Sequence, residues 1–122
     1  MAACALLLLG AGCAHRRIDR VMAGAIAAQQ GGAADMAHDG YERALELDDR
    51  VYGAANNLAL LALAAGDQAK AVDLLARELA AHPALPEARL NRALLFVRAG
   101  RYVDADPELA PGPGVGAAPR VV

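Results

Sequence analysis

The stretch GDQAKAVDLL at residues 66–75 is repeated in outline by GRYVDADPEL at residues 100–109, so the chain contains an internal repeat. The residues that recur at the same offset include Asn57 and Asn91, Gly66 and Gly100, Ala71 and Ala105, and Leu75 and Leu109. A shift of the same size in the other direction places Gly32 on Gly66 and Ala37 on Ala71. The matches define three units, at residues 18–51, 52–85 and 86–110.

Each unit has the parts of a helical hairpin. In the middle unit the apolar stretch AANNLALLALAA predicts a helix, which Gly66 ends and after which Asp67 caps a second helix at residues 68–81. The apolar residues of that second helix lie on one side, and they are Ala71, Val72, Leu75 and Leu79. Pro83 and Pro86 are then expected to stop it. Two short helices cannot bury both of their apolar faces alone, so neighbouring hairpins must stack.

The composition favours an all-α fold. Apolar residues make up 57% of the chain, but it holds one Phe, three Tyr and no Trp, and alanine and leucine supply most of the apolar content. There are 12 basic and 14 acidic residues, with no long basic stripe to neutralise phosphates. Nucleic acid is therefore not an expected partner.

The first residues differ from the rest of the chain. Residues 2–14, AACALLLLGAGCA, are uncharged, and they are too few to cross a bilayer, which needs about 20. This segment resembles a bacterial lipoprotein signal peptide at residues 1–13, in which Cys13 is lipidated and becomes the new N-terminus. Gly10 stands where that family prefers Leu, and no basic residue precedes the apolar run. A buried apolar helix or an unprocessed leader is the alternative. The other cysteine, Cys4, lies in the same segment, so no structural disulfide is expected.

The repeated unit resembles the tetratricopeptide repeat (TPR), a helix-turn-helix whose length equals the offset between Gly66 and Gly100. The best match is GAADMAHDGYERALELDD, which contains Gly32, while Glu78 stands where the pattern prefers a small Ala. The resemblance implies an all-α solenoid of about two and a half hairpins over residues 18–110, preceded by an apolar leader helix. Pro107 is expected to shorten the last helix. Residues 111–122, rich in Pro and Gly, are predicted to be a disordered tail.

In the TPR family the first helices of successive hairpins line a concave groove that binds peptides. The resemblance therefore implies a peptide-binding groove of Asn56, Asn57, Leu60, Leu63, Leu90, Asn91, Leu94 and Arg98, with Met22, Ile26, Gln29 and Val97 on the same face. Asn57 and Asn91 are expected to bond the ligand backbone, and the leucines to take its side chains. The alternative is that the polar residues bond neighbouring parts of the fold and the leucines are core. Glu87 and Asn91 replace the Lys and Arg that carboxylate-binding TPRs need, so that activity is not expected.

The sequence contains no arrangement typical of catalysis. His15, His38 and His82 are scattered without a paired nucleophile, and there is no phosphate-binding glycine loop. We therefore expect no enzyme, cofactor, metal or small-molecule substrate. The resemblance implies an exported, lipid-anchored adaptor of the cell envelope, on the outer membrane where the host has one, for pilus, secretion or envelope assembly. A cytoplasmic TPR scaffold or co-chaperone, or the N-terminal part of a larger TPR protein, is the alternative.

Overall fold

The computed structural model describes residues 2–101, with side chains from Gly12 onward. In this part of the chain the structure is all-helical, which confirms the predicted class. The five helices are α1 (Ala2–Gln30), α2 (Ala34–Leu47), α3 (Ala54–Ala64), α4 (Gln68–Ala81) and α5 (Pro86–Arg98). The predicted helix after Gly100 and the predicted tail at residues 111–122 lie outside the described residues.

The same glycine turn closes three helices at equal intervals along the sequence. The turn glycines Gly32, Gly66 and Gly100 have φ of 79°, 84° and 72°, a left-handed conformation in which side chains other than hydrogen are strained. At each turn the glycine N–H and the next N–H donate to carbonyls of the preceding helix, as in the bonds Gly66 to Leu63 at 3.0 Å and Asp67 to Ala62 at 2.9 Å. The predicted turns are therefore confirmed at all three positions.

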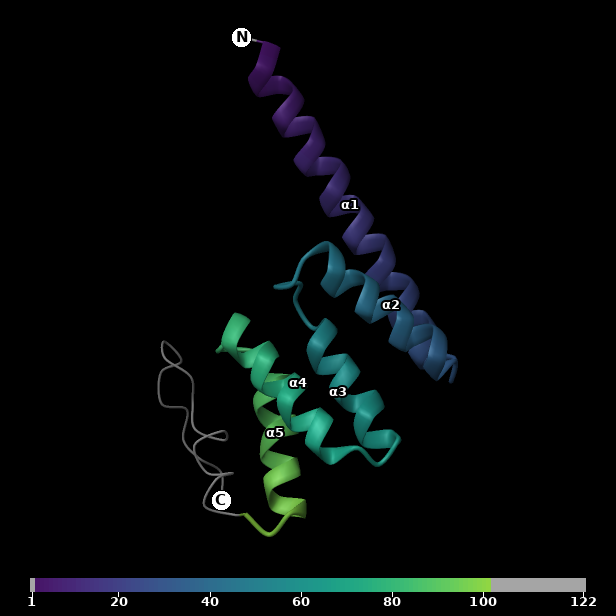
Figure 1. Cartoon of the computed structure of the whole chain (residues 1–122), viewed down its shortest axis with the longest axis vertical. Helices are drawn as coiled ribbons and strands as arrows, with labels where there is room; N and C mark the ends of the chain where they lie inside the picture. Colours follow the sequence, from purple (N-terminus) through teal and green to yellow (C-terminus); the bar gives the residue numbers. More distant parts are fainter. Residues whose placement is uncertain (1, 102–122) are drawn as a thin grey trace.

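Helices adjacent in sequence pack against each other along the whole described chain. Figure 1 shows α1 and α2 side by side, followed by α3, α4 and α5. Two clusters of buried residues fill the interior. One lies around Tyr41 between α1, α2 and α3, and the other lies around Leu75 between α3, α4 and α5. Leu74 packs against both clusters, so the two hairpins share one continuous apolar interior.

The first hairpin depends on a close approach of its two helices. A Cβ added to Gly40 in α2 would lie 2.7 Å from the Cβ of Ala25 and 3.2 Å from its Cα. Contacts this short are not tolerated between carbon atoms, so the two helices need a residue without a side chain at position 40. Ala25 and Ala37 are themselves buried, so small residues on both helices allow α1 and α2 to lie this close.

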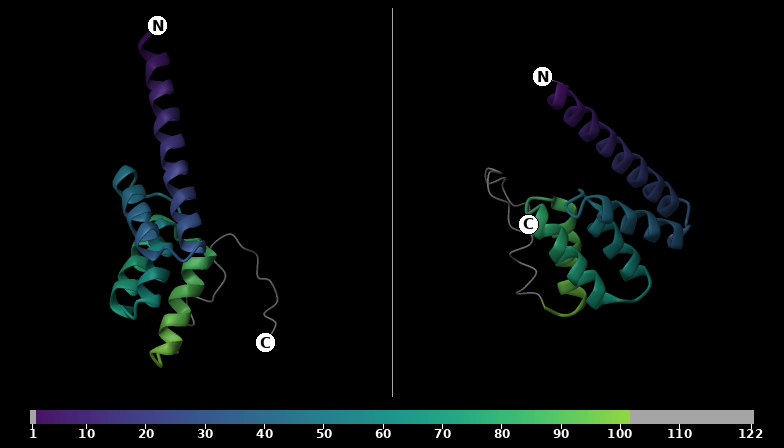
Figure 2. Two further views of the ribbon diagram at one scale, coloured as in Figure 1. Left: turned by 90° about the vertical axis from the view of Figure 1, so that its right-hand side faces the viewer. Right: turned by 45° about the horizontal axis from the view of Figure 1, so that its top comes forward.

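The helix α1 is a single helix of 29 residues, with no break at Cys13 or at Ile18. Its first half extends away from the other helices, as the views in Figures 1 and 2 agree. Among the described residues, no helix combines the length and the apolar content needed to cross a membrane. The predicted limit between leader and repeat array therefore falls inside one continuous helix.

The second hairpin follows the sequence prediction closely. The helix predicted at residues 68–81 is α4, and the Asp67 carboxylate accepts a hydrogen bond of 3.0 Å from the backbone N–H of Lys70, as a cap should. Pro86 was expected to help end α4, and this was wrong. It is the first residue of α5, where its missing N–H costs nothing because that N–H has no helical partner.

Candidate functional site

A hollow of about 220 Å³ lies between α3 and α5. Its walls are apolar on both helices, with an amide and a guanidinium among them. The lining residues are Leu60, Leu63, Asn91, Leu94, Leu95 and Arg98. Five of these belong to the eight residues that the sequence predicts for a peptide-binding groove. The structure therefore brings together side chains from two successive units of the repeat.

An exposed apolar row on α5 continues this surface. Leu90, Leu94 and Val97 are 51%, 48% and 40% exposed and follow one another at helical spacing, so they lie on one face. In contrast, Leu95 is buried at 3% exposure and belongs to the core around Leu75. We call Leu60, Leu63, Leu90 and Leu94 the leucine wall. An apolar row open to solvent beside a hollow is the kind of surface that marks interaction sites.

The amides predicted to bind a ligand form a connected row of hydrogen bonds inside the protein. Tyr41 Oη donates to Gln29 Oε1 at 2.6 Å and accepts from Asn57 Nδ2 at 3.2 Å. Asn56 Nδ2 donates to Asn57 Oδ1 at 3.2 Å, and Asn91 Nδ2 donates to Asn56 Oδ1 at 2.9 Å. We call these five residues the polar row. Its hydrogen bonds connect α1, α2, α3 and α5, so the polar row links successive hairpins.

The polar row changes the interpretation of the asparagines. Asn57 and Asn91 were expected to bond the backbone of a bound peptide, with bonding to neighbouring parts of the fold as the alternative. In the structure their amides bond Tyr41 and Asn56, which corresponds to that alternative. Asn56 is buried at 6% exposure, so its side chain is not accessible to a ligand in this structure. Asn91 both belongs to the row and lines the hollow. Asn91 is therefore the residue at which the polar row and the candidate binding surface meet.

Tyr41 is the most buried member of the row, with no exposed surface. Burial raises the pKa of its phenol, and the hydrogen bond from Asn57 partly opposes that shift. The phenol therefore keeps its proton across the physiological range and continues to donate to Gln29. A buried hydroxyl bonded on both sides is a stable link between α1 and α3.

A buried carboxylate, which the sequence pattern did not predict, holds the N-terminus of α3. The N-cap position of α3 is Gly53, which has no side chain to cap the helix. Instead Glu78 of α4, 2% exposed, accepts hydrogen bonds from the backbone N–H of Gly53 at 2.8 Å and of Asn56 at 3.1 Å. A carboxylate there satisfies two helix donors and lies at the positive end of the helix. The signal was present as an acidic residue at a position that the repeat pattern gives to alanine.

The loop between α2 and α3 is fastened to the end of α4. His82 is the C-cap residue of α4, and its Nε2 lies 2.7 Å from the carbonyl oxygen of Arg50, which requires a proton on that nitrogen. Arg50 in turn donates to the carbonyl of Ala81 at 3.2 Å, and the rings of Tyr52 and His82 meet edge to face at 5.2 Å. From the sequence, His82 was found only to lack a paired nucleophile, and these contacts with Arg50 and Tyr52 were not predicted.

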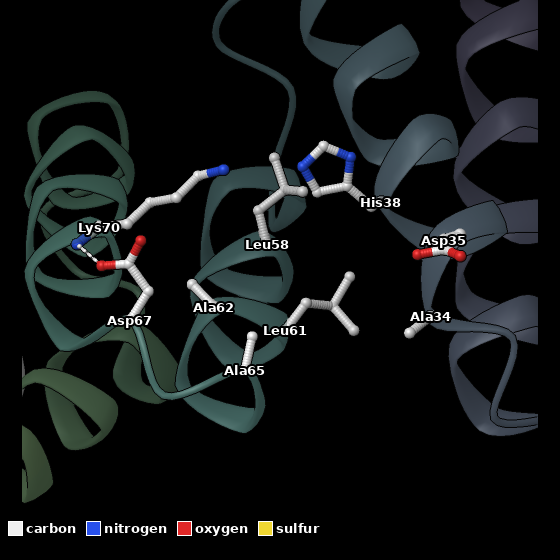
Figure 3. A pocket seen from close by; sticks show the side chains of 9 residues that line it. All are labelled: Ala34, Asp35, His38, Leu58, Leu61, Ala62, Ala65, Asp67 and Lys70. Carbon is white, nitrogen blue, oxygen red and sulfur yellow. Dashed lines mark hydrogen bonds between the residues drawn. The ribbon is translucent and has the colours of Figure 1, made fainter.

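Another hollow of about 220 Å³ lies where α2, α3 and the start of α4 meet. Figure 3 shows its apolar floor from α3, with Asp67 and Lys70 on one side and Asp35 and His38 on the other. The charges on its rim are of both signs, and Asp67 already caps α4. This arrangement favours no single class of ligand.

The remaining candidate residues are separate from these surfaces. The Cys13 thiol is free and exposed on α1. His15 lies 3.9 Å from Asp19 on α1, while His38 lies near Asp39 and Glu42 on α2. In the part of the chain that the structure describes, no group of three His, Cys, Asp or Glu residues is placed to hold a metal ion. Comparison of the chain with protein-family models and with curated proteins gives no match.

Proposed function

We propose that this chain is a protein-binding scaffold of the TPR type, which holds a peptide or protein segment against α3 and α5. The observation that carries the proposal is the leucine wall beside the hollow between these helices. Apolar side chains exposed together favour binding, because a partner that covers them removes apolar surface from water. The TPR part of the proposal is supported by the glycine turns, which recur at the interval typical of that repeat.

The hollow indicates which chemistry the partner should present. Its leucines suit an apolar side chain, and Asn91 and Arg98, which also line it, suit a carbonyl or carboxylate oxygen next to that side chain. A short segment with an apolar anchor and an acidic or backbone oxygen beside it is therefore the ligand we propose. Most of the affinity should come from the anchor, since solvent-exposed charge pairs contribute little.

A photo-crosslinking amino acid at position 94 tests this proposal in intact cells. We expect a discrete crosslinked product from Leu94 and none from the same probe at Met36, which is 70% exposed on α2 and away from the hollow. Mass spectrometry of the product then identifies the partner. Equal products from both positions, or none from position 94, would contradict the assignment of the binding surface.

We further propose that the scaffold is a lipoprotein anchored through Cys13, in the cell envelope. The support is the apolar run that ends at this cysteine and the exposure of its thiol on α1. Labelling of cells with a clickable fatty acid should mark the wild type and the Cys4→Ala variant but not the Cys13→Ala variant. An unlabelled protein with an intact Met1 would favour the alternative of a cytoplasmic scaffold.

A further inference from the structure

We infer that α1 carries a cationic face that docks on an anionic membrane surface beside the Cys13 anchor. This inference rests on the proposed lipid anchor, whose chain would bring this part of α1 to the bilayer. The face consists of Arg16, Arg17 and Arg20, all exposed. They follow Cys13 at i+3, i+4 and i+7, the spacing at which residues share one side of a helix. The anchor and the three guanidinium groups therefore project from the same side of α1, within about 11 Å along its axis.

A different side of α1 contacts the rest of the protein. Ile18, Met22 and Ala25 follow at i, i+4 and i+7 and are half-buried or buried. Ala25 belongs to the core around Tyr41, and Met22 packs against that core. The arginines therefore remain available when the helix packs against α2, and a flat surface can approach them without displacing any contact of the hairpin.

The distribution of charge along the chain indicates which kind of surface α1 binds. Residues 1–34 hold three arginines and one aspartate, whereas residues 35–122 hold nine basic and thirteen acidic residues. Asp19 follows Arg16 at i+3 and borders the arginine face, where its carboxylate lies 3.9 Å from His15 Nε2. An anionic surface therefore attracts the first half of α1 and repels the rest of the chain. This orients the protein with the first half of α1 on the headgroups.

The lipid anchor and the arginines then act together. The multiple acyl chains of a lipoprotein anchor hold the protein at the bilayer, and the basic cluster next to them adds electrostatic attraction to anionic lipids. The cationic face also sets an orientation, because headgroup contacts on one side of α1 oppose rotation about the lipid. The chemistry recognised is the phosphate of anionic lipid headgroups, for which the arginine fork is well suited.

Vesicle sedimentation of the reduced full chain, with an unmodified Cys13 verified by mass, tests the cationic face independently of lipidation. The variant is Arg16→Gln/Arg17→Gln/Arg20→Gln. The control, Arg43→Gln/Lys70→Gln/Arg77→Gln, removes as many charges from exposed positions on α2 and α4. Vesicles are phosphatidylcholine alone or an equal mixture with phosphatidylglycerol.

We expect the wild type and the control to bind the mixed vesicles far better than the neutral ones, with an advantage that falls at high salt. The arginine variant should lose roughly 100-fold in binding to mixed vesicles, since each basic side chain near such a surface gives about a fivefold gain. Equal binding by the arginine variant, equal loss by the control, or no preference of the wild type for anionic vesicles would overturn the inference. Fatty-acid labelling of Cys13 reports separately on the anchor, so failure of one part is distinguishable from failure of the other.

Discussion

The polar row and the leucine wall lie next to each other on α3 and α5, yet the structure gives them opposite roles. The amides of the row bond one another and Tyr41, whereas Leu90 and Leu94 of the wall remain about half exposed. The sequence pattern predicts one binding groove for both sets. The difference teaches that a polar residue on a predicted binding face is available to a ligand only if the fold does not already use it.

The largest effect on stability is expected from removing the buried carboxylate of Glu78. Glu78→Ala leaves the N–H groups of Gly53 and Asn56 without their acceptor in a buried place, and should lower the free energy of unfolding by about 2–4 kcal/mol. Urea denaturation followed by helical circular dichroism measures this. Glu42→Ala, on the exposed side of α2, is the control and should change stability by less than about 0.5 kcal/mol. Similar midpoints for the two variants would show that Glu78 is not a cap.

The α1 end of the polar row depends on the close contact at Gly40. Gly40→Ala should lower stability by about 1–3 kcal/mol, because the new methyl group overlaps Ala25 and separates the two helices. Gly24→Ala in α1 is the matched control, since nothing lies within 4 Å of the added Cβ. It should raise stability by about 0.5–1 kcal/mol through helix propensity. Opposite signs in thermal melts are predicted, and the same sign would refute the packing of α1 on α2.

The row itself should be needed for folding. Asn57→Ala with Asn91→Ala removes three bonds of the row and should lower stability by about 1–2 kcal/mol. Gln30→Ala, exposed at the end of α1, serves as the control. An unchanged denaturation midpoint in the double variant would show that the row does not stabilise the fold, and it would favour a ligand-binding role for both asparagines.

The sequence was sufficient for the local parts of the fold. The positions of Gly66 and Asp67 define a turn through conformations that glycine and an N-cap aspartate adopt regardless of the surroundings, so the limits of α4 followed. The TPR resemblance implied one face for Leu60 and Leu94, and both line the hollow between α3 and α5. The turn and the helix limits could be predicted because they depend only on residues close together in the sequence.

The polar contacts could not be predicted in the same way. Whether Asn57 meets Tyr41, or Glu78 meets Gly53, depends on how α2, α3 and α4 cross, and no local pattern carries that information. Two clues were nevertheless present. Gly53 lacks a capping side chain, and Glu78 replaces a small residue at a buried position of the repeat. A buried acidic side chain needs hydrogen-bond donors, and an uncapped helix has free N–H groups at its start. The two are therefore expected to bond each other when they lie close together.

The smallest effect on stability, and the largest on binding, is expected at the wall. Leu94→Ser should change the free energy of unfolding by less than about 0.5 kcal/mol, because this side chain is 48% exposed and outside both buried clusters. The denaturation midpoint should therefore match that of the wild type. A loss above about 1 kcal/mol would instead make Leu94 part of the core.

The central claim, that the wall binds a partner while the row holds the fold together, is tested most directly by crosslinking in cells from a photoreactive residue at position 90. The account predicts a crosslinked product with the native Leu94 that disappears in the Leu94→Ser variant, although both proteins accumulate to the same level and melt at the same temperature. A product that persists undiminished in the Leu94→Ser variant would contradict the claim and remove the leucine wall as the binding surface.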